Sequence, residues 1–255
     1  MILRLPKFIF LIFTIVFSAC TKDKTPACNS NGNKGDICTV QYLINGKNEK
    51  IEYYEYQNNT IYLIESEDKN NFKTSTLLVY EEDKISEKTT TDFKGRVLNT
   101  IEYTYKNGLI EKEIHNQDSV IEYFYNNQLL NKIKYYNHTN LVSWDTILYY
   151  PNQKVYQQKS YSQNNTLLKI EEFRWFVNNT FTQESILPDG TVFKKIIHNT
   201  NNQNQIIQQN IYNQNGELIE QNKKTYQNNK IMYESYNKLL SNELLEIIYH
   251  RIPSN

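Results

Sequence analysis

The side chains that most often carry chemistry are few and scattered in this sequence. The four His residues, at positions 115, 138, 198 and 250, are far apart, and none has a second His three or four residues away. A metal site would therefore have to be assembled across strands. The sequence contains no glycine-rich phosphate loop, no Gly-x-Ser-x-Gly elbow and no His-Glu-x-x-His motif. We therefore expect no enzymatic activity, no bound metal and no other cofactor.

Carboxylates recur because the tripeptide Ile-Glu-Tyr recurs, with Glu52, Glu102 and Glu122 at its centre. These three side chains are expected to form a row on one face of a sheet, and paired carboxylates could serve glycoside hydrolysis. Lys neighbours such as Lys106 favour a different interpretation, in which the row is a solvated polar face. We favour the polar face.

Aromatic residues are abundant, with 21 Tyr, 11 Phe and 2 Trp. Rows of aromatic rings on a sheet could stack against sugars or against a hydrophobic partner, and Trp144, Tyr149, Tyr150 and Trp175 are our candidates for such a binding surface. The alternative is that these rings form cross-strand ladders that hold the sheet together and set its register. A long sheet needs one well-packed face before it can offer another, so the ladder is the favoured interpretation.

The N-terminus has the organisation of a secretory signal: Arg4 and Lys7, an apolar run over residues 8–17, and then small residues. The tetrapeptide Phe17-Ser18-Ala19-Cys20 resembles the lipobox of bacterial lipoproteins. The resemblance implies a signal peptide over residues 1–19, cleavage before Cys20, and acylation, including palmitate, on that residue. Residue 21 is Thr rather than the Asp that favours retention in the inner membrane in this class. The resemblance therefore implies a Bacteroidota-like lipoprotein anchored in the outer membrane, facing either the periplasm or the cell surface.

Residues 20–36 are polar and contain Pro26, Gly32 and Gly35, which predicts a flexible tether. Cys28 and Cys38 remain after acylation of Cys20, in a compartment that permits disulfides. A structural disulfide is the first expectation and two free thiols the second. A redox or metal pair is disfavoured, because such sites usually have cysteines separated by two residues.

A short phrase recurs throughout the rest of the chain: an aromatic residue, a polar residue, Asn followed by Asn or Gly, and then an aliphatic residue. Residues 55–61, 104–110, 124–130 and 225–231 carry it, and looser copies lie at 149–155, 161–168, 175–181 and 212–219. Asn and Gly tolerate the positive φ that two-residue hairpin turns require. Each copy is therefore predicted to be the tip of a β-hairpin.

The residues between these tips alternate with strand periodicity. Ile101, Tyr103 and Tyr105 point one way, and Glu102 and Thr104 point the other. We therefore predict an all-β repeat domain over residues 37–255, an antiparallel hairpin meander that forms an extended twisted sheet. Residues 239–248 are the one stretch that is compatible with a short helix.

The hairpin phrases resemble the tyrosine-rich repeats of YD/RHS-type proteins and the MORN-like repeats of bacterial antitoxin-type lipoproteins. The resemblance covers roughly residues 50–250 and implies the fold more than the role.

The chain has 28 basic and 28 acidic residues, so the positive charge expected of a nucleic-acid binder is missing. Our first functional hypothesis is a non-enzymatic outer-membrane lipoprotein that acts as an interaction or structural surface, with a protein or glycan partner. The alternatives are an immunity or antitoxin-like protein at the envelope, and a carbohydrate-binding surface lipoprotein.

Overall fold

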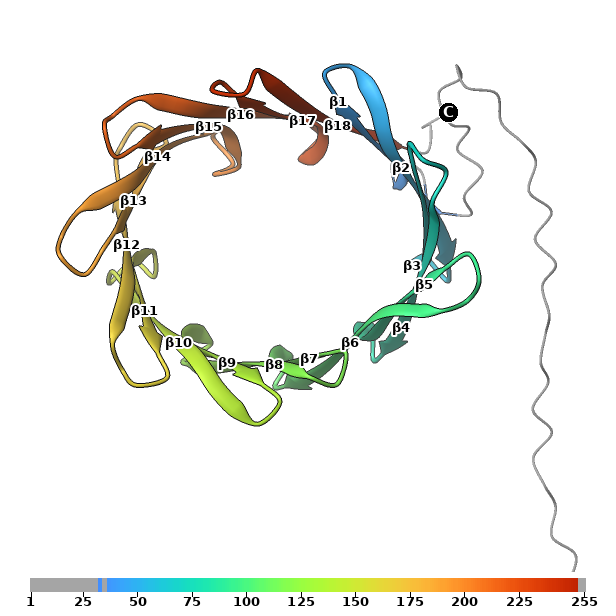
Figure 1. The fold of residues 1–255 in the computed structure, drawn as a ribbon, viewed down its shortest axis with the longest axis horizontal. Coiled ribbons are helices and arrows are strands. Elements are labelled where there is room, and N and C mark those ends of the chain that lie inside the picture. Colours follow the sequence, from blue (N-terminus) through green and yellow to red (C-terminus); the bar gives the residue numbers. More distant parts are fainter. Residues whose placement is uncertain (1–31, 34–35, 252–255) are drawn as a thin grey trace, which may run out of the picture.

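The computed structural model describes residues 32–33 and 36–251, which form a single curved sheet (Figure 1). The predicted Cys20 anchor, Cys28 and residues 1–31 lie outside this part of the chain. Among the described residues no helix is long and apolar enough to cross a membrane. The strands are β1 Ile37–Ile44, β2 Lys47–Gln57, β3 Thr60–Asp68, β4 Lys73–Glu81, β5 Lys84–Asp92, β6 Val97–Lys106, β7 Leu109–His115, β8 Ser119–Asn126, β9 Leu129–Asn137, β10 Asn140–Tyr149, β11 Val155–Ser162, β12 Leu167–Trp175, β13 Thr180–Ile186, β14 Val192–Thr200, β15 Ile206–Asn213, β16 Leu218–Gln227, β17 Lys230–Lys238 and β18 Glu243–Arg251.

The predicted antiparallel meander is confirmed, because each strand pairs with the next one along the chain. The predicted extended sheet is wrong, because the 18 strands close into a barrel (Figure 1). Strand β1 pairs with β2 on one side and with β18 on the other, and in the closing ladder Val40 lies opposite Tyr249. Twist and curvature accumulate along a long sheet, and closure removes the two unpaired edges that an open sheet would expose.

The turns of the recurring phrase have the predicted backbone conformation. Both central residues have positive φ at Asn58–Asn59, Asn107–Gly108, Asn127–Gln128 and Asn228–Asn229. Such turns match the right-handed twist of the strands that they join. They explain why Asn is so frequent in this chain.

The barrel has two rims, and the copies of the phrase divide between them. The first rim carries the turns that follow even-numbered strands, including all four close copies and the looser copies at 149–155 and 175–181. The second rim carries the turns that follow odd-numbered strands, including the looser copies at 161–168 and 212–219. The structural repeat is therefore a pair of strands rather than a single strand.

The stretch 239–248 does not form a helix. Leu239–Asn242 is a turn, and Glu243 begins β18. Strand β18 has a partner on each side, β17 and β1, so backbone pairing at the closure of the barrel overrides local helix propensity.

The two faces of the barrel wall differ in crowding. Almost all buried side chains of the described strands lie on one face, as the cross-strand pairs Phe181 with His198 and Ile196 with Ile211 illustrate. Side chains converge on the concave side of a closed sheet and diverge on its convex side, so the crowded face is the concave one. The buried residues of this concave face are Val40, Tyr56, Leu78, Asp92, Asp145, Ile147, Glu171, Phe181, Ser185, Ile196, His198, Ile211, Asn222 and Glu234.

Candidate functional site

The hairpins are splayed at the first rim. In β15 and β16, for example, the ladder ends at the pair Gln208 and Lys223, so the start of β15 and the end of β16 diverge beyond it. We call the divergent ends of an odd-numbered strand and the following even-numbered strand a fork. A fork leaves the first carbonyl groups of the odd-numbered strand without a ladder partner, and such groups need another donor.

In six forks that donor is a side chain at the end of the even-numbered strand, which we call the clasp. The clasp bonds are Tyr56 Oη to Ile37 O at 2.8 Å, Tyr105 Oη to Ile85 O at 2.8 Å, Tyr149 Oη to Leu130 O at 2.7 Å, Trp175 Nε1 to Val155 O at 2.9 Å, Tyr226 Oη to Ile206 O at 3.1 Å and Arg251 Nη2 to Ile231 O at 2.7 Å. The aromatic residue of the recurring phrase thus closes the hairpin that precedes its turn. The sequence could have indicated this role, because the aromatic residue stands 19 or 20 positions after the carbonyl that it bonds.

Removal of one clasp is expected to cost little. The change Tyr226→Phe deletes one hydroxyl that donates to a backbone carbonyl, so the free energy of unfolding should fall by about 0.5–1.5 kcal/mol in a denaturant titration. Tyr212→Phe is the matched control, because the Tyr212 hydroxyl has no hydrogen-bond partner among the described residues. Equal stability of the two variants would contradict the role of the clasp.

The fork between β7 and β8 differs from these six. Its ladder ends at Lys112 opposite Glu122, and Tyr125, which occupies the clasp position, makes no such bond to β7. A pocket of about 420 Å³ lies at this place. It is lined by Lys106, Asn107, Leu109, Glu111, Tyr123, Phe124, Tyr125, Asn127 and Gln128.

The sequence analysis placed the aromatic residues of this pocket in a strand and a hairpin tip but proposed none of them as a binding residue. The pocket lies where the pairing between β7 and β8 stops. The point at which two paired strands separate cannot be read from a single sequence. The pocket is the candidate site of this structure.

The four predicted binding aromatics do not form one surface. Tyr149, Tyr150 and Trp175 lie at the first rim on β10, the following turn and β12, and the Tyr150 hydroxyl donates to Phe173 O at 3.3 Å. Trp144 lies in the middle of β10 on the convex face, opposite Tyr161 of β11. The predicted binding role of these four residues stays a prediction.

The rings of the two tryptophans are in contact with other side chains of the barrel. Trp144 stacks on Tyr161 with 4.2 Å between ring centroids, and Lys132 Nζ lies 4.2 Å from the Trp144 ring. Trp175 stacks on Phe181 at 4.3 Å, and Lys154 Nζ lies 4.4 Å from the Trp175 ring. These contacts are the cross-strand aromatic packing that the sequence favoured.

The predicted row of carboxylates does not form. Glu52 lies on the concave face, whereas Glu102 and Glu122 lie on the convex face. Glu52 stands four residues before the tyrosine at the clasp position of its strand, whereas Glu102 and Glu122 stand three residues before theirs. A shift of one residue moves a side chain to the opposite face.

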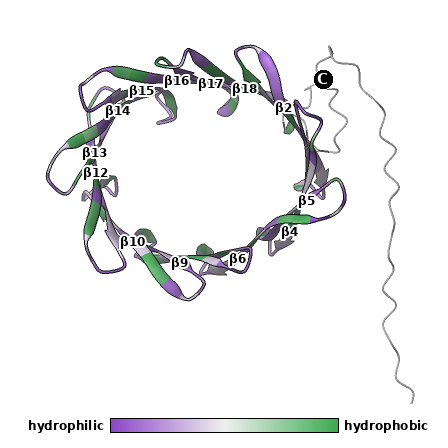
Figure 2. Cartoon of the chain, viewed as in Figure 1, coloured by the Kyte–Doolittle hydropathy of each residue, from purple (hydrophilic) through white to green (hydrophobic). Residues whose placement is uncertain are grey.

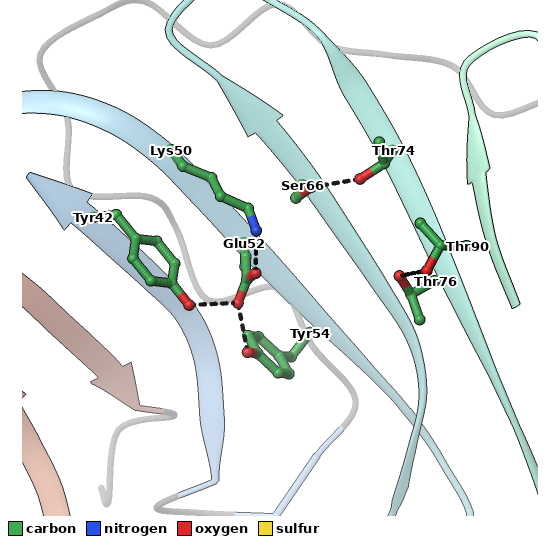
Figure 3. A network of polar contacts seen from close by, with 8 residues as sticks. All are labelled: Tyr42, Lys50, Glu52, Tyr54, Ser66, Thr74, Thr76 and Thr90. Carbon is green, nitrogen blue, oxygen red and sulfur yellow. Dashed lines mark hydrogen bonds and ion pairs between the residues drawn. The ribbon is translucent and has the colours of Figure 1, made fainter. Parts of the chain in front are cut away.

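Glu52 instead has a cluster of donors on the concave face (Figure 3). Its carboxylate accepts hydrogen bonds from the hydroxyls of Tyr42 at 3.1 Å and Tyr54 at 2.8 Å, and Lys50 Nζ lies 2.6 Å away. Burial and the adjacent Glu52 carboxylate raise the pKa of both tyrosines well above the ordinary value of 10.0. Both tyrosines are therefore protonated donors at any physiological pH.

A second cluster on the same face surrounds Glu234 of β17. Its buried carboxylate accepts hydrogen bonds from Tyr236 and, at 2.6 Å, from Tyr249, and Lys224 Nζ lies 2.7 Å away. Burial alone would raise the pKa of Glu234, but the hydrogen bonds from these three donors outweigh it and lower the pKa below its usual value. Glu234 is therefore ionised, and its carboxylate accepts hydrogen bonds that link neighbouring strands.

The His residues are not brought together. His198 is buried on the concave face, stacked on Phe181 at 4.0 Å, and its Nδ1 lies 3.1 Å from Gln209 Nε2. His115 lies 3.2 Å from Glu113, and His138 lies 3.2 Å from Asp118. Within residues 36–251 no group of three His, Cys, Asp or Glu side chains could hold a metal ion.

Cys38 is in a disulfide whose partner lies outside the described residues. Cys28 stays the predicted partner.

No protein-family model and no curated protein matches the sequence. Solved structures do match. A porin-like protein from Bacteroides uniformis aligns with a TM-score of 0.50 and 7% identity, over 87% of this chain and 99% of that one. The chain shares the fold of that protein.

Two other similarities are weaker. A porin-like protein from Bacteroides vulgatus aligns with a TM-score of 0.31 and 8% identity, over 86% of this chain and 99% of that one. The Photorhabdus luminescens Tc holotoxin pore aligns with a TM-score of 0.35 and 12% identity, over 74% of this chain and 14% of that one.

Proposed function

We propose that this protein is a non-enzymatic barrel at the outer membrane, anchored through acylated Cys20, that acts as an interaction or structural surface. In this proposal the lipid anchor holds the barrel at the membrane, and both faces of the barrel wall are in water.

The observation that carries the proposal is a row of ionisable side chains across the convex face. Lys112 pairs with Glu122, Glu122 with Lys134, and Lys134 with Trp144, in the middle of β7 to β10. Directly paired residues of antiparallel strands point to the same face. This row lies on the face opposite to buried Asp145 and is therefore on the convex side.

A barrel that spans a bilayer presents an apolar band about 25 Å tall on its convex face, and each Lys or Arg at the bilayer midplane costs about 2–4 kcal/mol. Ionisable residues continue around this barrel, for example at Glu184. Its carboxylate lies 3.5 Å from Arg174 Nη2 and 3.1 Å from Lys195 Nζ. Hydrophilic and hydrophobic segments alternate around the whole ring (Figure 2). Such a wall favours contact with water over contact with lipid tails.

The clusters on the concave face support a role without turnover. Glu52 and Glu234 each accept hydrogen bonds from two tyrosine hydroxyls and lie beside one lysine, so both carboxylates are engaged in contacts within the barrel wall. The shared fold with a Bacteroides porin-like protein and the lipobox-like Cys20 both favour the outer membrane as location.

The change Cys20→Ala tests the anchor. Because Cys20 would be the only attachment to the membrane, the variant should move from the pelleted envelope fraction to the soluble fraction, whereas the wild-type chain should remain in the pellet after a carbonate wash. Mass spectrometry of the wild-type N-terminal peptide should show acyl chains. A Cys20→Ala chain that is folded and still resists carbonate extraction would contradict the proposal, because a barrel embedded in lipid needs no anchor.

A further inference from the structure

The β7–β8 fork exposes two strand edges that face each other. Beyond Lys112 and Glu122 the two strands no longer pair, yet each keeps its outer neighbour: Ile110 still pairs with Tyr105 of β6, and Tyr125 still pairs with Leu130 of β9. One backbone edge of each strand is therefore directed into the fork. Unpaired strand edges are templates for another strand.

No side chain of the barrel fills this fork as a clasp. Tyr125 corresponds to Tyr105 and Tyr226, which bond the first carbonyls of their forks. The Tyr125 hydroxyl makes no hydrogen bond among the described residues, and the space between the edges is the pocket of about 420 Å³. The fork thus has both free backbone groups and room for a ligand.

The pocket is lined from both sides of the wall. Tyr123 and Tyr125 belong to the concave face, since Tyr123 lies opposite Ile133 and Ile133 opposite buried Asp145. Phe124, which alternates with them, belongs to the convex face and is exposed. A ligand in this pocket contacts side chains from both faces of the wall. A β-strand suits such a pocket, because its own side chains alternate between the two faces. A sugar ring stacked on one aromatic residue would use only one of these faces.

We propose that the β7–β8 fork binds a short extended peptide segment, which adds to the free edges of β7 and β8 as a strand. This inference rests on the proposed interaction role and names the class of partner. The rings of Tyr123, Phe124 and Tyr125 supply contacts for apolar side chains of the peptide. Lys106 and Glu111, an exposed ion pair at 3.6 Å, supply one charge of each sign for its polar side chains. Backbone pairing gives such a site affinity, and the side-chain contacts give it specificity.

The test uses the full chain with a reversible closure of the fork. Glu111 and Tyr123 are the first residues beyond the last ladder pair, and the double variant Glu111→Cys, Tyr123→Cys is designed to close the opening with a disulfide, whose formation is verified by mass spectrometry. Because the variant removes the Tyr123 ring and the Glu111 carboxylate, its oxidised form is compared only with its own reduced form, with a peptide that the reduced form binds. The probes are a positional-scanning library of end-blocked pentapeptides, the selected peptide with alternate amides N-methylated, and a panel of oligosaccharides. Binding is measured by fluorescence polarisation.

We expect the wild-type chain to bind a subset of the peptides and N-methylation to weaken binding at least tenfold. The oxidised double variant should bind the selected peptide at least tenfold more weakly than its reduced form, while the wild-type chain keeps its affinity under both conditions. Equal affinity of the oxidised and reduced variants, equal affinity of the N-methylated peptide, or binding of oligosaccharides but of no peptide would each overturn the inference. None of these failures would change the fractionation of Cys20→Ala, so the two proposals fail separately.

Discussion

The change Glu234→Ala is expected to lower the free energy of unfolding by about 3–5 kcal/mol. The variant removes the buried carboxylate and leaves three partly buried donors, Tyr236, Tyr249 and Lys224, without their acceptor. One partly buried ammonium group and two partly buried hydroxyls then each carry a desolvation penalty, and together these penalties exceed the net contribution of a single hydrogen bond. Denaturant titration of the purified chain, followed by circular dichroism, measures the change.

An exposed ion pair on the same hairpin supplies the control. Lys238 lies 2.7 Å from Glu243; the Lys238 side chain is exposed and that of Glu243 is partly exposed. Exposed pairs of this kind contribute about 0–1 kcal/mol, so Glu243→Ala should change stability little. If Glu234→Ala is no more destabilising than Glu243→Ala, the cluster around Glu234 does not stabilise the barrel.

Acidification from pH 6.5 to pH 4 is expected to destabilise the barrel through His198. Burial lowers the pKa of His198 from 6.5 to about 4, because the protonated ring would lose its hydration. Across this window the unfolded chain binds a proton at His198 and the folded chain does not. The free energy of unfolding therefore falls as the pH falls, by about 2–3 kcal/mol for this residue.

The variant His198→Phe isolates this contribution. A Phe ring can stay stacked on Phe181 but cannot bind a proton, so the loss of stability between pH 6.5 and pH 4 should shrink by most of that amount. The burial of His250 lowers its pKa in the same direction, so part of the slope should remain. His138→Gln serves as the control, because His138 is exposed. An unchanged pH dependence in His198→Phe would show that His198 is protonated as easily in the folded chain as in the unfolded one.

The local features of the fold could be predicted from the sequence because they depend on neighbouring residues. The pair Asn58–Asn59 sets a hairpin turn through its own backbone preference, and the alternation of Ile101, Glu102 and Tyr103 sets a strand. Closure could not be predicted in this way. It depends on the pairing of Val40 with Tyr249, which lie at opposite ends of the chain, and no local pattern distinguishes that pairing from two free edges.

The candidate site was missed for a related reason. The side-chain identities of Tyr123 and Phe124 were visible, but the site exists because the β7–β8 ladder ends at Glu122. The faces of Glu52 and Glu102, however, could have been distinguished from the sequence, because the two residues stand four and three positions before the tyrosine near the end of their strands. Tyr149 and Trp175 were predicted as binding residues, and that role stays a prediction. The structure gives them clasp bonds at the first rim, a role that the sequence analysis did not predict.

The accessibility of the convex face at the membrane tests the central claim most directly. A single Cys introduced at Lys134, in the middle of the convex row, is treated in isolated envelope fragments with a membrane-impermeant maleimide, beside a Cys introduced at Gln128 in a turn of the first rim. An anchored barrel whose wall is in water predicts labelling at Lys134→Cys at a rate close to that at Gln128→Cys. Protection of Lys134→Cys in the envelope, with labelling only after unfolding in urea, would contradict the account and place the wall of the barrel in lipid.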